Sequence, residues 1–205
     1  IWSSWCETYA QPDDSWVWHP YTASERAINM LVHARQYGFA GSHDTFRDSL
    51  VIHAENISKK LEYFGNHHTS NHMANNGRGL YLIGLWLGLE NATKLGAKIL
   101  LEEAQRIFTP TGILREGSSH YHFLLARNYN EVCAAARDYD RPEAPQLAEI
   151  ANKTLRHLPA FKLPGGFPLI GDISPDLSPD RLLAELSELD FGSVSGPQKT
   201  ALPEA

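Results

Sequence analysis

The fold is decided by one stretch, Asn71-His72-Met73-Ala74-Asn75-Asn76-Gly77-Arg78-Gly79-Leu80-Tyr81-Leu82-Ile83-Gly84-Leu85-Trp86-Leu87-Gly88. Glycines alternate there with large apolar side chains, and each interior glycine costs a helix about 1 kcal/mol relative to alanine. A helix with this pattern is favoured where neighbouring helices approach closely, or where its apolar surface is buried nearly all round. The stretch therefore predicts a buried inner helix from about residue 70 to residue 87.

The segments on both sides of this stretch are also helical in pattern. Apolar residues recur at steps of three and four over residues 46–64, 92–107, 125–139 and 144–161. Two more helices are expected, over residues 23–37 and, shorter, 179–189, whereas strand-like alternation is missing. Ser42 and Asp44 are cap candidates for the helix over residues 46–64. The pattern predicts an all-α fold of about six long helices, with sequential neighbours packed antiparallel.

Composition excludes several classes of protein. The 205 residues are 42% hydrophobic and 20% charged, which is typical of a soluble globular domain. No apolar run reaches the roughly 18 residues of a membrane span, and the first residues lack the features of a signal peptide. Neither end resembles a natural terminus, so we expect a fragment of a longer chain. The net charge of −6 argues against a nucleic-acid partner. The two cysteines, Cys6 and Cys133, leave open one disulfide or two free thiols.

Two polar stretches, residues 66–78 and 115–122, hold five of the ten histidines. Between residues 66 and 89 the only formally charged side chain is Arg78. Dense hydrogen-bond donors with few carboxylates favour stabilisation of an anion beside a proton-transferring group. Asn71 and His72 fall at the start of the inner helix, and Tyr121 falls in the first turns of a later one. Helix starts favour bound anions, although capping and core packing would explain each of these residues taken singly.

Other kinds of site fit the sequence less well. The histidine spacings include no HExxH motif and no paired cysteines, so we expect neither a metal nor a cofactor. Glu116 is the one prominent carboxylate near the two stretches, whereas a glycosidase needs two. No nucleophile elbow is present, and Ser118 is a good candidate for a helix N-cap.

Three motifs together resemble the heparinase II/III family of polysaccharide lyases, which includes oligoalginate lyases. They are Trp18-His19-Pro20-Tyr21-x-x-Ser24-Glu25-Arg26, Asn71-His72-x4-Gly77-Arg78-Gly79-Leu80-Tyr81 and Gly112-x2-Arg115-Glu116-Gly117-Ser118-x2-Tyr121. The resemblance implies a partial α/α toroid of antiparallel helix hairpins over residues 21–162. An aromatic-rich segment, 1–20, precedes it, and a loop-rich segment, 163–205, leads toward a β-sandwich domain that is absent from this chain.

The resemblance also implies the reaction, a β-elimination beside a uronic acid, and a periplasmic or secreted location. By position in the motifs, Asn71 and His72 match the pair that neutralises the uronate carboxylate. Tyr121 matches the tyrosine that transfers protons. Where some members carry a glutamate three residues after the histidine, this chain has Asn75.

Further residues are expected to support substrate binding around these three. An unperturbed tyrosine has a pKa of about 10, so a tyrosine base needs nearby positive charge or donors. The candidate substrate-binding residues are Arg78, Asn75, Arg115, Glu116, His122 and His68.

Two other functions stay open. One is a helical module that binds acidic polysaccharide without catalysis, with Trp2, Trp5, Trp16 and Trp18 as possible stacking surfaces for sugars. The other is a helical scaffold with no site at all. If the chain is a lyase, its partner is an acidic polysaccharide. A chain without the family's β-sandwich is expected to be weakly active or inactive.

Overall fold

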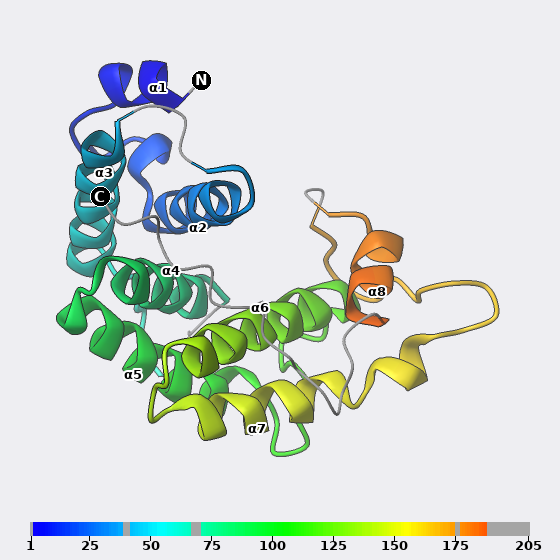
Figure 1. Cartoon of the computed structure of the whole chain (residues 1–205). Helices are drawn as coiled ribbons and strands as arrows, with labels where there is room; N and C mark the ends of the chain where they lie inside the picture. Colours follow the sequence, from blue (N-terminus) through cyan, green and yellow to red (C-terminus); the bar gives the residue numbers. More distant parts are fainter. Residues whose placement is uncertain (1, 39–41, 67–70, 175–176, 188–205) are drawn as a thin grey trace. The chain divides into compact units, whose positions relative to one another are not determined.

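The computed structural model describes residues 2–38, 42–66, 71–174 and 177–187. In this part of the chain all regular structure is helical, and no strand forms beyond two isolated bridges. The all-α class is therefore confirmed. Figure 1 shows the elements, which are α1 (Trp2–Thr8), η1 (Trp16–Trp18), α2 (Pro20–Tyr37), α3 (His43–Lys59), α4 (Asn71–Leu87), α5 (Glu90–Ile107), α6 (Ser119–Asp138), α7 (Ala144–Leu155), η2 (Leu158–Phe161) and α8 (Pro179–Ser187).

The expected helices are present, but two of them end earlier in the chain than predicted. The stripe expected to run to residue 64 ends at Lys59, and Phe64 is exposed. The stripe expected to run to residue 161 ends as an α-helix at Leu155 and continues only as the short η2. Pro159, which has no N–H to donate, lies inside η2. The short α1 was not expected from the sequence.

The chain divides into two compact units, an N-terminal unit, Ile1–Arg106, and a C-terminal unit, Ile107–Ala205. This division falls elsewhere than the expected boundaries after residues 20 and 162. Trp18 belongs to the same core as α2, α3 and α4, and Trp2 and Trp5 pack against that core. The first 20 residues thus contribute to the packing of the N-terminal unit.

In the N-terminal unit, α4 is the inner helix that the glycine pattern predicts. Most of its side chains from Met73 to Leu85 are buried. A Cβ added at Gly79 would lie 2.8 Å from the Ser24 side chain on α2, and one at Gly84 would lie 2.5 Å from the Thr93 backbone nitrogen on α5. Conversely, a Cβ at Gly96 of α5 would lie 2.5 Å from the Tyr81 backbone nitrogen on α4. Glycines on both helices therefore permit the close approach.

Two tryptophans near the N-terminus pack against a partly buried arginine. The Arg26 guanidinium lies 4.2 Å from the centroid of the Trp5 ring and 5.1 Å from that of Trp18. Its Nε donates to His53 Nε2 at 2.9 Å. Burial lowers the pKa of His53 to about 4 and the pKa of Arg26 to about 10. This arrangement explains three of the four expected stacking tryptophans as packing residues, since Trp2 also packs against the core.

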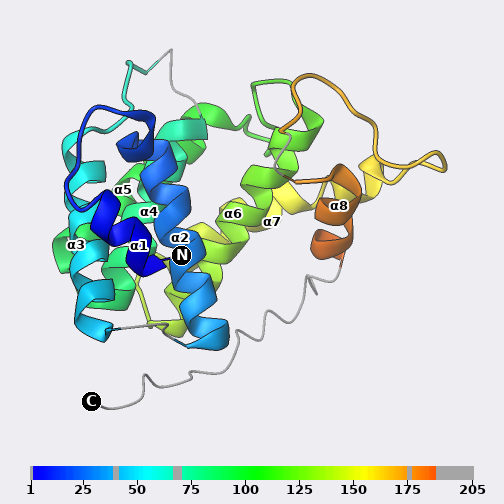
Figure 2. The same ribbon diagram turned by 90° about the horizontal axis from the view of Figure 1, so that it is seen from above.

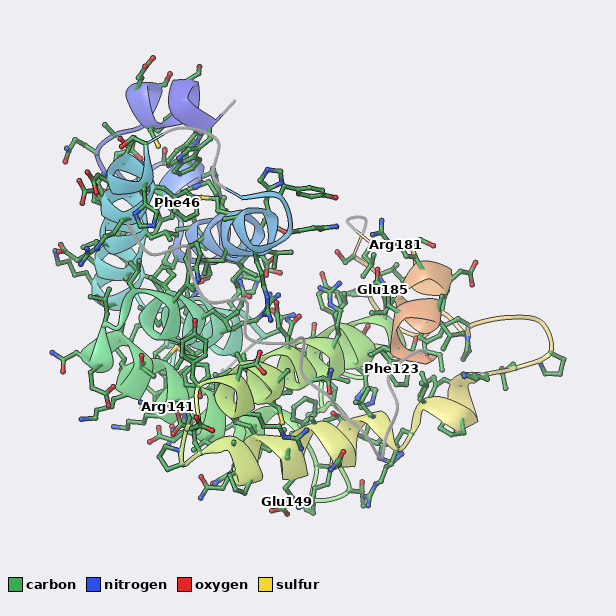
Figure 3. All side chains as sticks on the ribbon, viewed as in Figure 1. Phe46, Phe123, Arg141, Glu149, Arg181 and Glu185 are labelled. Carbon is green, nitrogen blue, oxygen red and sulfur yellow. The ribbon has the colours of Figure 1, made fainter. Side chains whose placement is uncertain are left out.

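The C-terminal unit is built on the antiparallel pair α6 and α7, with α8 packed against α6 (Figure 2). Its core includes Phe123 on α6, Leu155 on α7 and Leu182 on α8. Figure 3 labels Phe123, and also Phe46, which belongs to the core of the N-terminal unit. In the same figure Arg181 and Glu185 are labelled on α8, where they form an ion pair of 3.0 Å.

Two further observations bear on the expectations from composition. Cys6 and Cys133 are both free thiols. Among the residues that the structure describes, no helix combines the length and the apolar character needed to cross a membrane.

Candidate functional site

Asn71 and His72 are the first two residues of α4, and both side chains are partly exposed. The first turn of a helix has backbone N–H groups without partners inside the helix, and it lies at the positive end of the helix dipole. No acidic residue lies in the first turn of α4. Within α4 itself, this helix start therefore favours a bound anion.

His72 is paired with Glu62, a residue that the motifs did not single out. His72 Nδ1 lies 2.7 Å from Glu62 Oε1, and the Asn76 amide donates to Glu62 Oε2 at 3.0 Å. The Glu62 backbone N–H in turn donates to Asn76 Oδ1 at 3.0 Å. The side chain of Glu62 is 7% exposed and that of His72 is 46% exposed. The carboxylate is thus held on the protein side of a ring that reaches solvent.

The ionisation of Glu62 follows from these contacts. Burial by itself raises the pKa of Glu62, but hydrogen bonds from His72 and Asn76 outweigh it and hold the pKa below its ordinary value. Because an ionised carboxylate can only accept hydrogen bonds, the proton between the two groups belongs to His72 Nδ1. The other ring nitrogen, Nε2, is the one turned away from Glu62.

Three aromatic residues of the N-terminal segment surround this pair. His19 Nε2 lies 3.6 Å from Glu62 Oε1, so the carboxylate has an imidazole on two sides. The Tyr21 ring lies 4.6 Å from the His72 ring, and the Trp16 ring lies 4.9 Å from the His19 ring. Trp16 itself is 79% exposed, unlike the tryptophans of the core.

Arg78 and Asn75 are turned toward the interior of the N-terminal unit. Arg78 is 5% exposed, and its Nη1 lies 2.9 Å from Glu25 Oε1 on α2. Asn75 is also buried, and its amide donates to the Tyr21 carbonyl oxygen at 3.4 Å. These partners argue against the substrate contacts that we expected from both residues. They join α4 to α2 beneath His72.

The start of α6 carries Tyr121 in the C-terminal unit. Ser118 is the N-cap, as expected, because its Oγ accepts from the Tyr121 N–H at 3.0 Å. Residues 168–174, which we call the strap, are held against this helix start. Ser118 Oγ donates to the Asp172 carbonyl at 2.6 Å, and the Ser119 N–H donates to the Ile170 carbonyl at 2.9 Å. Tyr121 is partly exposed beside these contacts.

His122 does not have the surroundings of a substrate-binding residue. It is 2% exposed, and its Nδ1 accepts from the Leu114 N–H at 3.2 Å. Its Nε2 lies 3.2 Å from the Thr154 carbonyl oxygen. Burial lowers the pKa of His122 to about 4, so the ring stays neutral and joins the 108–114 turn to α7. We therefore withdraw His122 from the expected substrate-binding residues. His120 is buried as well, and its Nδ1 accepts from the Ser174 N–H of the strap.

The remaining expected residues are Arg115, Glu116 and His68. Arg115 and Glu116 are exposed in the turn before α6. His68 lies outside the described residues. Within the described residues, no group of three histidine, cysteine or carboxylate side chains is arranged to hold a metal ion.

The structure thus brings His72 together with Glu62, His19 and Tyr21 in the N-terminal unit, and Asn71 precedes His72 at the start of α4. Tyr121 belongs to the C-terminal unit. A sequence signal for Glu62 did exist, because it is the only acidic residue between Glu55 and Glu90. An isolated carboxylate close to a histidine-rich turn suggests a partner for one of those histidines.

Comparison of the chain with protein-family models, with curated proteins and with solved structures finds no match. The resemblance drawn from the three motifs therefore stays an expectation.

Proposed function

We propose that this chain is the helical part of a polysaccharide lyase that cleaves uronate-containing polymers by β-elimination. In this proposal Asn71 and His72 neutralise the uronate carboxylate, and Tyr121 transfers the proton. The observation that carries the proposal is the start of α4, where a half-exposed imidazole is held by a buried carboxylate. The α/α toroid, a β-sandwich domain beyond this chain and a periplasmic or secreted location belong to the same proposal.

The chemistry explains why such a helix start is useful. Removing the proton next to a carboxylate places a second negative charge on that group in the transition state. Donors aimed at the carboxylate stabilise this charge, and removing one such donor typically costs 10²–10³ in rate. The Asn71 amide and, in the protonated ring, His72 Nε2 are donors of this kind.

Tyr121 is assigned the roles of base and acid. Its position in the first turn of α6, beside the exposed Arg115 turn, supports the assignment. Among the residues expected to support substrate binding, Arg78 is paired with Glu25 and His122 is buried and neutral, so neither supplies charge to a tyrosine base. Arg115, which is exposed and belongs to the same unit as Tyr121, remains as a cation for this role.

A second candidate function is binding of acidic polysaccharide without cleavage. The exposure of Trp16 favours it, because an exposed aromatic ring next to hydrogen-bonding side chains suits the apolar face of a sugar. The His19 ring beside Trp16 and the His72 ring beyond it would contact the polar edges of the same chain.

An assay with chemically matched substrates tests the proposal. The chain is incubated with alginate, heparan sulfate or hyaluronan, and with the same polymers after their carboxyl groups have been reduced to alcohols. We expect unsaturated uronate ends, detected by ultraviolet absorbance, from at least one native polymer and from none of the reduced ones. Because the chain without the β-sandwich is expected to be weakly active or inactive, the same assay is run on the longer protein that the proposal expects. Failure of that protein to produce such ends from any native uronate polymer contradicts the proposal. Binding of intact polymer in the same experiment would then favour the second candidate.

A further inference from the structure

Glu62 lies at the centre of the contacts around His72, and neither motif resemblance nor composition assigns it a role. We propose that Glu62 is a positioning residue, which holds His72 in the Nδ1–H tautomer and directs Nε2 toward the substrate carboxylate. This inference deepens the proposed function and rests on it for the identity of the ligand. Its structural part, the tautomer of His72, can be measured without any substrate.

The first reason is that both carboxylate oxygens of Glu62 are fixed. Oε1 is bound by His72 Nδ1 at 2.7 Å and faces His19 Nε2 at 3.6 Å. Oε2 is bound by the amide of Asn76, a residue with no exposed surface. Because the Glu62 backbone N–H also bonds Asn76 Oδ1, the residue is held to α4 at two points. A carboxylate fixed in this way fixes the ring that bonds to it.

The second reason is the contrast in burial within the pair. The Glu62 side chain is nearly inaccessible, whereas almost half of the His72 side chain is exposed. Glu62 is therefore not placed to meet a polymer itself, and it would repel a uronate if it were. Its charge acts through the imidazole, in the same way that carboxylates orient the ring of a metal-bound histidine.

The third reason concerns what the ring can present to a ligand. With the proton of the neutral ring on Nδ1, Nε2 is the nitrogen turned away from Glu62. A second proton on Nε2, balanced by the negative charge of Glu62, makes the ring a charged donor for a carboxylate. Without Glu62 the neutral ring is free to exchange tautomers, and the extra proton loses its counter-charge.

A merely structural role for Glu62 predicts a different outcome. In that case Glu62 would only attach the segment after α3 to α4, and its loss would lower stability without changing the tautomer of His72. Glu103 provides a matched control, because it is another buried carboxylate of the same unit. It pairs with Arg106 on its own helix, α5.

The experiment is nitrogen NMR of the imidazole rings in the whole chain, as wild type, Glu62→Gln and Glu103→Gln. The His72 signals are assigned by their loss in His72→Gln. At the neutral end of a pH titration we expect wild-type His72 to carry its proton on Nδ1. Glu62→Gln should move it toward the Nε2–H form, and Glu103→Gln should leave it as in wild type. A bare Nδ1 in the wild type, or the same tautomer in wild type and Glu62→Gln, overturns the inference.

Activity provides the link to the proposed function. By analogy with carboxylates behind metal-bound histidines, we expect Glu62→Gln to lower kcat/KM about 10- to 100-fold on uronate polymer. Glu103→Gln, compared at an equal folded fraction, should retain the wild-type value. If the tautomer changes as expected but the longer protein that contains the β-sandwich cleaves no uronate polymer, the positioning role stands and the proposed function fails. If the polymer is cleaved while the tautomer is unchanged, the positioning role fails.

Discussion

The starts of α4 and α6 both carry histidines, but His72 and His122 have opposite surroundings. His72 is half exposed and bonds to a buried carboxylate, Glu62. His122 is buried, and its bonds go to the backbone of Leu114 and Thr154. Both side chains are imidazoles. Their partners decide which one is suited to a ligand and which one holds the fold together.

The difference lies in the charge that each site supports. A carboxylate beside an imidazole stabilises an added proton, so the pair suits work on an anion. Two backbone partners and burial favour the neutral ring, because one ring nitrogen must accept and the other must donate. The α4 start is therefore the better candidate for substrate binding. The α6 start contributes Tyr121 and otherwise consists of structural contacts.

The largest expected effect of replacing these two histidines is on stability. Replacing His122 by Ala removes the partners of the Leu114 N–H and the Thr154 carbonyl and leaves a cavity. We expect the free energy of unfolding to fall by about 3 to 4 kcal/mol. His72→Ala, at a half-exposed position, should cost about 1 kcal/mol or less. Urea denaturation of both variants measures this, and equal losses would contradict the contrast.

The second effect is the pH dependence of stability through His122. Its pKa is about 4 in the folded protein and 6.5 unperturbed, so the unfolded chain binds more protons between these values. Stability through this group is complete above pH 6.5 and is lost as the pH falls toward 4. The shift corresponds to about 3 kcal/mol.

The contribution of His122 is measured by comparing the urea denaturation midpoints of wild type and His122→Gln between pH 4 and pH 7. His53, which also has a pKa lowered to about 4, contributes equally to both proteins. We expect the difference between the two proteins to shrink as the pH falls. A difference that stays constant with pH would show that the pKa of His122 is not lowered in the folded protein.

The third effect is acid sensitivity through Glu62, and it occurs in a lower pH range. The pKa of Glu62 lies below its unperturbed value of 4.5 in the folded protein. Stability from Glu62 is therefore complete above pH 4.5 and is lost as the pH falls through the lower, folded-state value. Glu62→Gln should lower stability at neutral pH and flatten this acid loss. An acid loss of stability that is as steep in Glu62→Gln as in wild type would contradict the ionised pair.

The smallest expected effect on stability is at Trp16. Because its side chain is mostly exposed, Trp16→Ala should change the free energy of unfolding by about 0.5 kcal/mol or less. Trp18→Ala, in the core, should cost about 3 to 5 kcal/mol. Retention of the chain on immobilised uronate polymer should nevertheless weaken in Trp16→Ala. Unchanged retention would remove Trp16 from the binding surface.

The sequence predicted the helices well where the signal was local. The glycine pattern located α4 almost to the residue, because close packing against α2 and α5 needs small residues at fixed positions. The Ser118 cap was also predicted, because its side chain bonds to a backbone N–H only three residues along the chain. The end of α3 was not predicted correctly. Leu61 and Phe64 continue the apolar spacing of a helix, but α3 ends at Lys59.

The contacts of the site depended on distant residues and were not predictable from local pattern. Glu62 reaches His72 only because the chain turns after α3 and returns to α4. The burial of His122 depends on Thr154, 32 residues away along the chain. Arg78 was also predicted wrongly to bind substrate. An arginine near several histidines suggests an anion-binding site, and its pairing with Glu25 on α2 cannot be read from the local sequence.

The most direct test of the central claim is the initial rate of unsaturated uronate formation by wild type, Tyr121→Phe and Tyr139→Phe. Tyr139 lies at the other end of α6 and is partly exposed, so its variant controls for the loss of a tyrosine hydroxyl from this helix. We expect Tyr121→Phe to lose about 10²- to 10⁴-fold in rate with the fold intact, and Tyr139→Phe to match wild type. Cleavage by Tyr121→Phe at the wild-type rate would contradict the account.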